Sequence, residues 1–384
     1  MADRADDDTR YHVPAWLDIL GGLVERWPEA WTRLGDIETR RLQTQLADQA
    51  IDRPVYVTGL ARAGSTVLLE LLSRHPDVVT HRYRDFPMVH VPWFWNRFVD
   101  SNAKAPERPQ ERAHGDGIAV TAESPEAFEE VLWMTFFRDA HNPAVSNVLG
   151  HDDGNPEFDA FYRDHLRKLL WMRQGRRYLA KGNYNVTRLG YLQRLFPDAR
   201  FIVPIRDPVS HVASLMRQHE RFQQVGREHL RARRHMRRAG HYEFGLDLRP
   251  INVGDQDAIV RIQRLWSSGE EIEGWARYWS MIYRHVADVC DADPGVRDAT
   301  FVVRFEDLCR APGEVMLWVQ RHAGLHSKEL PDMAEQRIRV PDYYRQPFTP
   351  EQRRLIWECT AETATRFGYA GPDVEAPVIP AGAA

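Results

Sequence analysis

One stretch, "VYVTGLARAGSTVLLELLSRHP" at residues 55–76, restricts the possible folds more than any other part of this 384-residue chain. Its first residues are apolar, as in a buried β-strand, and the apolar residues after Gly64 recur at helical spacing. A loop with two glycines joins these segments. A strand, a glycine loop and a helix N-terminus in this order direct backbone N–H groups and a partial positive charge at one point, which suits a phosphate. The stretch therefore predicts an anion site at a strand–helix junction rather than an ordinary corner.

The loop nearly matches the Walker A motif of nucleotide triphosphatases. Gly59 and Gly64 have the required separation, but Ser65 stands where that motif has lysine, and Arg62 is the only cation in the loop. Two kinds of site remain open at this point: a phosphate site of another class, or a Mg²⁺-dependent P-loop kinase or NTPase acting on a small molecule. The second would need a neighbouring strand that ends in a metal-binding acid.

Short apolar segments alternate with predicted helices along most of the chain. We expect further strands at 77–81, 177–181, 200–205 and 300–308, the last three leading into predicted helices. This alternation is typical of a parallel sheet that is covered by helices on both faces. The predicted fold class is therefore α/β, a central parallel sheet flanked by helices, with helical insertions.

The same pattern indicates one main domain at 53–371. We expect residues 1–52 to form a helical segment that packs on this domain, and residues 372–384 to form a flexible tail. Two insertions, at about 82–140 and 217–255, interrupt the alternation. We expect them to cover the substrate site.

A helix expected at 13–27 carries a stripe of apolar residues at helical spacing. They are Trp16, Ile19, Leu20 and Leu23. Acidic residues and sparse lysines argue against a helix that lies on a membrane surface. We therefore expect this stripe to pack against the rest of the protein.

Composition excludes several classes of protein. Charged residues make up 28% and hydrophobic ones 43%, and the formal charge is −4, so no overall field attracts nucleic acid or a membrane surface. Three widely spaced cysteines lack metal-ligand spacing, which predicts no metal and reduced thiols. No apolar run approaches the roughly 18 residues that a spanning helix needs. We expect a cytoplasmic protein without stable membrane insertion.

A second anion site is predicted at "FIVPIRDPVSHVASL". Arg206 ends an apolar strand, at the edge where ligands gather in an open parallel sheet. Ser214 lies just over two helical turns further on and can point back to that edge. The two could bind a second phosphate, with charge-assisted contacts from the arginine. An ion pair between Arg206 and Asp207 is the alternative.

Three motifs in order resemble the family of sulfotransferases that use 3′-phosphoadenosine 5′-phosphosulfate (PAPS). They are "GLARAGSTVLLELLSRHP", "KGNYNVTRLGYLQRLFPDARFIVPIRDPVSHVASL" and "VVRFEDL". The resemblance runs from about Pro54 to Tyr369 and is closest to bacterial and Golgi-type members. It implies a P-loop-kinase-like sulfotransferase fold, PAPS as nucleotide co-substrate, the desulfated nucleotide PAP as product, and no metal.

The resemblance also assigns roles to residues. It implies that the first loop holds the 5′-phosphosulfate and that Arg206 and Ser214 bind the 3′-phosphate. The loop residues concerned are Arg62, Ala63, Gly64, Ser65 and Thr66. Arg62 matches the catalytic basic residue beside the bridging oxygen, and Lys181 matches a lysine near the sulfate. Arg345 lies in a segment that resembles one closing over the nucleotide, and is expected to contact the 3′-phosphate.

The identity of the general base remains open. Cytosolic animal members carry a catalytic histidine two residues after the lysine that Lys181 matches, but this chain has Asn183 there, which cannot accept a proton. Golgi-type and several bacterial relatives use a carboxylate about twenty residues after the loop's basic residue, and the nearest carboxylate here is Asp85, which follows the second strand. His81 is the main rival, since imidazole titrates in the useful range. His114 and Glu130 are weaker rivals.

The acceptor is expected to be a hydroxyl, or an amine, of a small molecule, glycan or lipid. Aromatic residues of the first insertion could line its pocket or form core: Trp93, Phe94, Trp95, Trp133, Phe136 and Phe137. The basic segment 226–238 could steer an anionic ligand or form a solvated helix face. The turn at 241–243, with His241 and Glu243, could gate the pocket.

Overall fold

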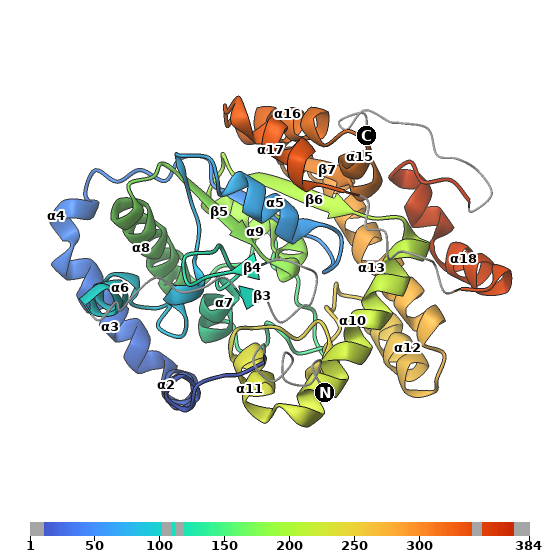
Figure 1. Cartoon of the computed structure of the whole chain (residues 1–384), viewed down its shortest axis with the longest axis horizontal. Coiled ribbons are helices and arrows are strands. Elements are labelled where there is room, and N and C mark those ends of the chain that lie inside the picture. The colour runs from blue at the N-terminus through green and yellow to red at the C-terminus, as the bar shows by residue number, and fades with distance from the viewer. Residues whose placement is uncertain (1–10, 102–109, 112–118, 340–347, 372–384) are drawn as a thin grey trace.

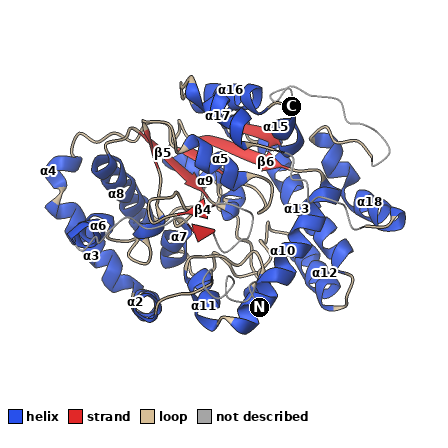
Figure 2. Cartoon of the chain, viewed as in Figure 1, coloured by secondary structure: helices blue, strands red, loops and turns tan. Residues whose placement is uncertain are grey.

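The computed structural model describes residues 11–101, 110–111, 119–339 and 348–371. Its centre is a sheet of five parallel strands in the order β2-β5-β1-β6-β7. The strands are β1 (Val55–Val57), β2 (Val78–Val79), β5 (Arg177–Lys181), β6 (Arg200–Ile205) and β7 (Thr300–Arg304). Helices surround the sheet (Figure 2). The predicted α/β class with a central parallel sheet is confirmed.

The side chains of the strands alternate between two hydrophobic clusters. Val55 and Val57 belong to the cluster on one face, whereas Tyr56 between them belongs to the cluster on the other face. All three are fully buried. Burial on both faces explains why this strand reads as a continuous apolar run in the sequence.

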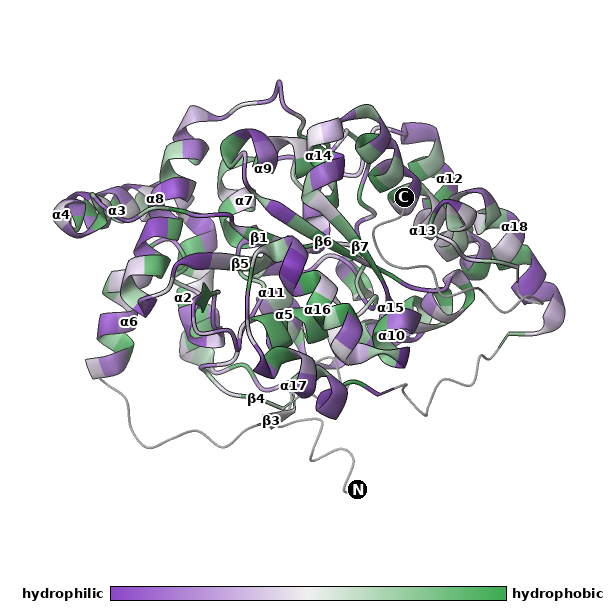
Figure 3. Cartoon of the chain, turned by 90° about the horizontal axis from the view of Figure 1, so that it is seen from above, coloured by the Kyte–Doolittle hydropathy of each residue, from purple (hydrophilic) through white to green (hydrophobic). Residues whose placement is uncertain are grey.

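Helices cover both faces and extend beyond the β7 edge (Figure 1). On the Val55 face lie α5 (Ser65–Leu72), α16 (Pro312–Ala323) and α17 (Glu329–Arg337). On the Tyr56 face lie α7 (Glu130–Phe136), α8 (Pro156–Arg173), α9 (Leu189–Leu195) and α14 (Pro294–Ala299). A further cluster joins α10 (Pro208–Glu228), α12 (Gln256–Ser267), α13 (Glu271–Ala292) and α18 (Pro350–Arg366). Figure 3 shows hydrophobic residues along the strands and mixed hydropathy along the helices.

Some element bounds differ from the predicted ones. The strand expected at 77–81 comprises only β2, Val78–Val79. The strand expected at 300–308 ends at Arg304, and α15 (Phe305–Arg310) follows directly. Two acidic residues in the first turn of α15 suit the positive end of a helix, which explains the switch.

Three N-terminal helices lie against the main body. α2 (Ala15–Arg26) contacts α11 (Leu230–Arg238), and α3 (Pro28–Arg41) and α4 (Gln43–Leu46) contact α8. The expected packing of the α2 apolar stripe is wrong, because Trp16 and Ile19 are 58% and 66% exposed. The helix docks instead through its opposite side, where Arg238 lies close against Gly21.

The predicted insertions form mostly short elements. These are η1 (Tyr83–Asp85), α6 (Pro92–Ser101), the antiparallel pair β3 (Gln110–Glu111) and β4 (Ala119–Val120), and η3 (Gly245–Asp247). None of the helices in the described ranges combines the length and apolar character needed to cross a bilayer. The described residues also contain no group of three or more His, Cys, Asp or Glu side chains arranged to hold a metal ion.

Candidate active site

The loop between β1 and α5 turns sharply before the helix begins. Gly64 caps α5 with φ 96°, and Arg62 has φ 74°, both in the left-handed region. A Cβ atom on Gly64 would lie 2.8 Å from Cδ2 of Phe305, so the loop backbone approaches this ring closely. The loop is therefore shaped as a cradle at the N-terminus of a helix, where backbone N–H groups favour an anion.

The second predicted anion site lies beside this loop. Arg62 Nε donates a hydrogen bond to Ser214 Oγ at 3.4 Å, which joins the loop to α10. Arg206 is buried at the end of β6, and its guanidinium carbon lies 4.8 Å from the centroid of the Phe305 ring. Phe305 thus contacts both the loop and Arg206. Asp207 caps α10, accepting a hydrogen bond from Ser210 N at 2.8 Å.

A buried histidine supports the loop from α10. Trp279 Nε1 donates to His211 Nδ1 at 3.1 Å, so the ring hydrogen lies on Nε2 and is donated to Ala61 O at 2.9 Å. Burial, against the opposing effect of the Ala61 hydrogen bond and with help from the charges of Arg206 and Arg62, lowers the pKa of His211 to about 3. His211 is therefore neutral and holds the loop through one hydrogen bond.

The end of β5 completes this edge of the sheet. Lys181 pairs in register with Val57, the last residue of β1. Gly182 N then donates to Val57 O at 3.0 Å, so the segment after β5 begins beside the loop. The structure thus brings Lys181, Arg62, Arg206 and Ser214 to the carboxyl edge of three adjacent strands.

The sequence matches the family model described as "Sulfotransferase family" over residues 54–247, just over half of the chain. The chain belongs to the sulfotransferase family. The matched residues include Arg62, Lys181, Arg206 and Ser214, the four residues at the carboxyl edge of the sheet.

Solved bacterial sulfotransferases resemble this sulfotransferase at low sequence identity. They include STF9 from Mycobacterium avium (16% identity, 88% of this chain and 82% of that chain, TM-score 0.47). STF1 from Mycobacterium tuberculosis H37Rv shows 18% identity over 93% of each chain, with TM-score 0.44. A sulfotransferase from Alicyclobacillus acidocaldarius shows 15% identity over 83% of this chain and 94% of that chain, with TM-score 0.41. No curated protein matches the chain.

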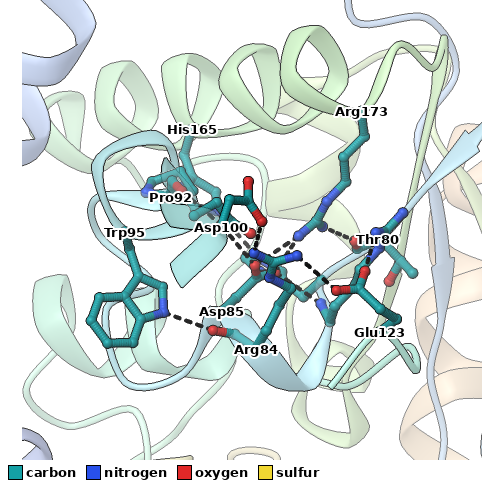
Figure 4. A network of polar contacts seen from close by, with 12 residues as sticks. Thr80, Arg84, Asp85, Pro92, Trp95, Asp100, Glu123, His165 and Arg173 are labelled. Carbon is teal, nitrogen blue, oxygen red and sulfur yellow. Dashed lines mark hydrogen bonds and ion pairs between the residues drawn. The ribbon is translucent and has the colours of Figure 1, made fainter. Parts of the chain in front are cut away.

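Asp85, the favoured base from the sequence, lies in a closed polar network (Figure 4). Arg173 of α8 donates to both of its carboxylate oxygens, at 2.7 and 2.8 Å, and Asn96 donates to one at 3.1 Å. Arg82 N donates to Oδ2 at 2.8 Å. Burial would raise the pKa of Asp85, but the His81 hydrogen bond and the Arg173 charge hold it well below its usual range. A fully buried carboxylate that accepts four hydrogen bonds is a poor proton acceptor, which favours a structural role for Asp85.

His81 belongs to the same network. Its Nδ1 lies 3.4 Å from Asp85 Oδ2, and its Nε2 lies 3.2 Å from Nε2 of His165. Both histidines are buried. The side chains of Arg82 and Arg84 instead pair with Glu123, and Arg84 also pairs with Asp100. His81 therefore has no exposed nitrogen to present to an acceptor in this arrangement.

The weaker rivals are no better placed. Glu130 accepts from both terminal nitrogens of Arg188, at 2.7 and 2.8 Å, and lies 2.8 Å from His141. Burial would raise the pKa of Glu130, but the charges of Arg188 and His141 lower it to about 2. His114 and Arg345 lie outside the described residues.

Most aromatic candidates for the acceptor pocket belong to the core. Trp133 is fully buried beneath the guanidinium of Arg188, and Phe136 and Phe137 pack against the same cluster. Trp95 is buried and donates to Arg84 O at 2.7 Å. The helical spacing of Trp133, Phe136 and Phe137 in "FEEVLWMTFF" is consistent with this core packing.

Three arginines of the basic segment 226–238 pair with acidic residues of α2. Arg234 and Arg238 pair with Asp18, and Arg237 and Arg238 pair with Glu25. The segment therefore fastens the N-terminal helix to α11, which leaves less charge to steer an anionic ligand than the sequence suggested.

Two residues near the loop were missed by the sequence reasoning. His211 and Phe305 support the loop, but neither belongs to a recognisable motif of charge or hydroxyl groups. Their place in the chain gives a local signal: His211 follows shortly after β6, and Phe305 comes directly after β7. Residues just beyond parallel strands lie at the edge of the sheet where ligands bind.

The contact between Gly64 and Phe305 leads to a testable prediction. Gly64→Ala should weaken nucleotide binding about tenfold or more, because the new Cβ would push the loop backbone away from Phe305. Isothermal titration calorimetry with PAP measures the effect. Gly269→Ala is the matched control, since Gly269 also has a positive φ, 86°, but open space around it. Equal PAP affinities in both variants would contradict a close-fitting loop.

Proposed function

We propose that this sulfotransferase transfers a sulfuryl group from PAPS to a hydroxyl, or an amine, of a small-molecule, glycan or lipid acceptor. Family membership supports sulfuryl transfer in general. The observation that carries the assignment of PAPS is the hydrogen bond between Arg62 and Ser214 at 3.4 Å, which unites two anion motifs at one edge. A donor with phosphate groups at both its 5′ and 3′ positions fits two adjacent anion sites.

The proposed reaction is an in-line transfer. By analogy with phosphoryl transfer, the transition state is loose, and charge accumulates on the leaving phosphate and on the sulfuryl oxygens. Arg62 and the loop N–H groups stabilise the leaving phosphate, and Lys181 stabilises the sulfuryl oxygens. Arg206 and Ser214 hold the 3′-phosphate and so fix the donor in position.

The kinase or NTPase alternative has less support. Ser65 occupies the position of the Walker lysine at the start of α5, where its side chain is buried. The strand β6 beside β1 ends at Ile205 and is followed by Arg206, not by a metal-binding acid. Both features suit a donor whose 3′-phosphate is recognised by arginine.

The 3′-phosphate assignment predicts a selective loss of affinity. Ser214→Ala should weaken PAP binding about tenfold, the worth of one hydrogen bond to a charged group. Binding of adenosine 5′-phosphate, which lacks the 3′-phosphate, should change less than about twofold. Titration calorimetry with both nucleotides measures the difference. Ser73→Ala is the control, because the Ser73 hydroxyl donates only to Glu70 O of its own helix at 2.9 Å. Equal losses for the two nucleotides would contradict the assignment.

A further inference from the structure

The turn after α11 is fastened against the segment that follows β5. Tyr242 N donates to the hydroxyl of Tyr184 at 3.0 Å, and Gly245 N donates to His219 Nδ1 at 3.1 Å. Tyr184 lies just after β5, in η2 (Asn183–Thr187), and His219 lies on α10. The turn between these anchors contains His241 and Glu243. It is therefore held in place between two elements that carry the proposed donor site.

The side chains of the turn form a chain of polar contacts. Asn183 Nδ2 donates to Glu243 Oε1 at 2.8 Å. Glu243 Oε2 faces His241 Nδ1 at 3.5 Å. The side chains of His241 and Glu243 are each only 14% exposed. Asn183 thus holds a carboxylate, and the carboxylate faces an imidazole.

This chain of contacts lies close to the reacting end of the donor site. Asn183 comes two residues after Lys181, whose charge acts on both His241 and Glu243. A cavity of about 30 Å³ lies beside the pair, lined also by Phe222, Met236 and Phe244. This small, partly open pocket has room for a water molecule next to the pair.

The charged groups around His241 make its imidazole a stronger base. Burial lowers the pKa of His241, but the hydrogen bond and charge of Glu243 outweigh it, with help from Glu126, so the net shift is upward. Lys181 acts in the opposite direction. Burial would raise the pKa of Glu243, but His241 and Lys181 lower it. Beside them His235 of α11 is neutral, because burial lowers its pKa to about 4.

We propose that His241 is the general base of the transfer, with Glu243 and Asn183 as positioning residues. This inference rests on the proposed function. His241 Nε2 removes the proton of the acceptor hydroxyl while its oxygen bonds to sulfur, and the bond from sulfur to the bridging oxygen breaks. PAP leaves with that electron pair, and the proton later passes from His241 to solvent. Asn183, which cannot itself accept a proton, then serves to hold the carboxylate that orients the base.

The test uses the full chain and PAPS alone, with water as the acceptor and release of PAP as the readout. His241→Gln should lower the rate about 10²- to 10⁴-fold, the usual contribution of a general base. The wild-type rate should fall as pH drops through the pKa of His241, and His241→Gln should lose this acid limb. Glu243→Gln should move the limb to lower pH, because the carboxylate that raises the pKa of His241 is gone.

Two controls separate a base from a structural residue. Added imidazole should restore part of the rate to His241→Ala, whereas a misfolded variant would not respond. His151→Gln, which removes another histidine–carboxylate pair (His151 Nε2 to Asp293 Oδ2, 2.6 Å), should leave the rate and its pH profile unchanged.

The outcomes distinguish this inference from the proposed function. PAP should raise the melting temperature of His241→Gln as much as that of the wild type. Wild-type rates and profiles in His241→Gln and Glu243→Gln, with PAP binding intact, would overturn the role of the pair alone. Absence of PAP binding and of PAP release in the wild type would overturn the proposed function and this inference together.

Discussion

Arg62→Ala should release PAP from PAPS about 10²- to 10³-fold more slowly than the wild type, the usual cost of removing one donor that meets transition-state charge. The guanidinium of Arg62 is placed between the loop and Ser214, where the bridging oxygen of the donor is expected. Because this charge matters most when the bond to the leaving phosphate breaks, kcat should fall more than KM rises. Steady-state PAP release over a range of PAPS concentrations up to saturation measures both constants.

Arg62→Lys provides the conservative comparison. Lysine keeps the charge but lacks the planar guanidinium, so part of the rate should return while the contact to Ser214 weakens. Arg354→Ala, on the exposed face of α18, is the matched control and should behave as the wild type. An Arg62→Ala enzyme within about threefold of the wild-type kcat, a difference of less than 1 kcal/mol, would remove this arginine from the proposed reaction.

Asp85→Ala should lower the free energy of unfolding by about 3–5 kcal/mol, the usual cost of leaving a buried charge without its partner. Arg173 is 7% exposed at this pair and would lose both of its carboxylate contacts. Urea denaturation measures the change. Asp164→Ala, which removes a part-exposed ion pair on the same helix, should cost at most about 1 kcal/mol.

The pH dependence of stability adds a second readout for Asp85. Its pKa is lowered in the folded protein, so its stabilising effect is complete above the unfolded value near 4 and is lost as the pH falls below that value. The stability difference between the wild type and Asp85→Asn should therefore shrink from pH 7 to pH 3. Asp85→Asn should also keep most of its turnover where it is folded. A large loss of kcat in a stable Asp85→Asn enzyme would restore Asp85 as a candidate base.

Local sequence patterns predicted the parts of the fold that local chemistry determines. The strand at 177–181 was predicted with its observed bounds, because a short apolar run ends there at Lys181 and Gly182. The junction at 55–76 was predicted because glycines, hydroxyls and helical spacing follow one another directly. In both cases the signal and the structure lie within a few residues of each other.

Partners that are distant in the sequence could not be predicted. Arg82 and Arg84 lie close to Asp85 in the sequence, yet its ion-pair partner is Arg173, 88 residues away on α8. Glu243 reaches Asn183 across 60 residues. Pair formation at such distances depends on how helices pack, and the sequence contains many arginines that could have served equally well.

The orientation of α2 shows the same limit in another form. Its apolar stripe predicted burial, but the pairing of Asp18 with Arg234 and Arg238 turns the opposite side of the helix toward α11. The hydrophobic pattern of a helix identifies its apolar stripe. Which face of the helix is buried also depends on the charges and shape of the element on which it packs.

Thermal unfolding of the full chain with PAP, with ATP plus Mg²⁺, and without ligand tests the central claim most directly. A ligand that binds only the folded state raises its stability by mass action. At a PAP concentration about 100 to 1,000 times its Kd, the melting temperature should rise by roughly 3–5 °C, and ATP plus Mg²⁺ should raise it far less. Stabilisation by ATP plus Mg²⁺ without any by PAP would contradict a PAPS-dependent sulfotransferase and favour a P-loop kinase.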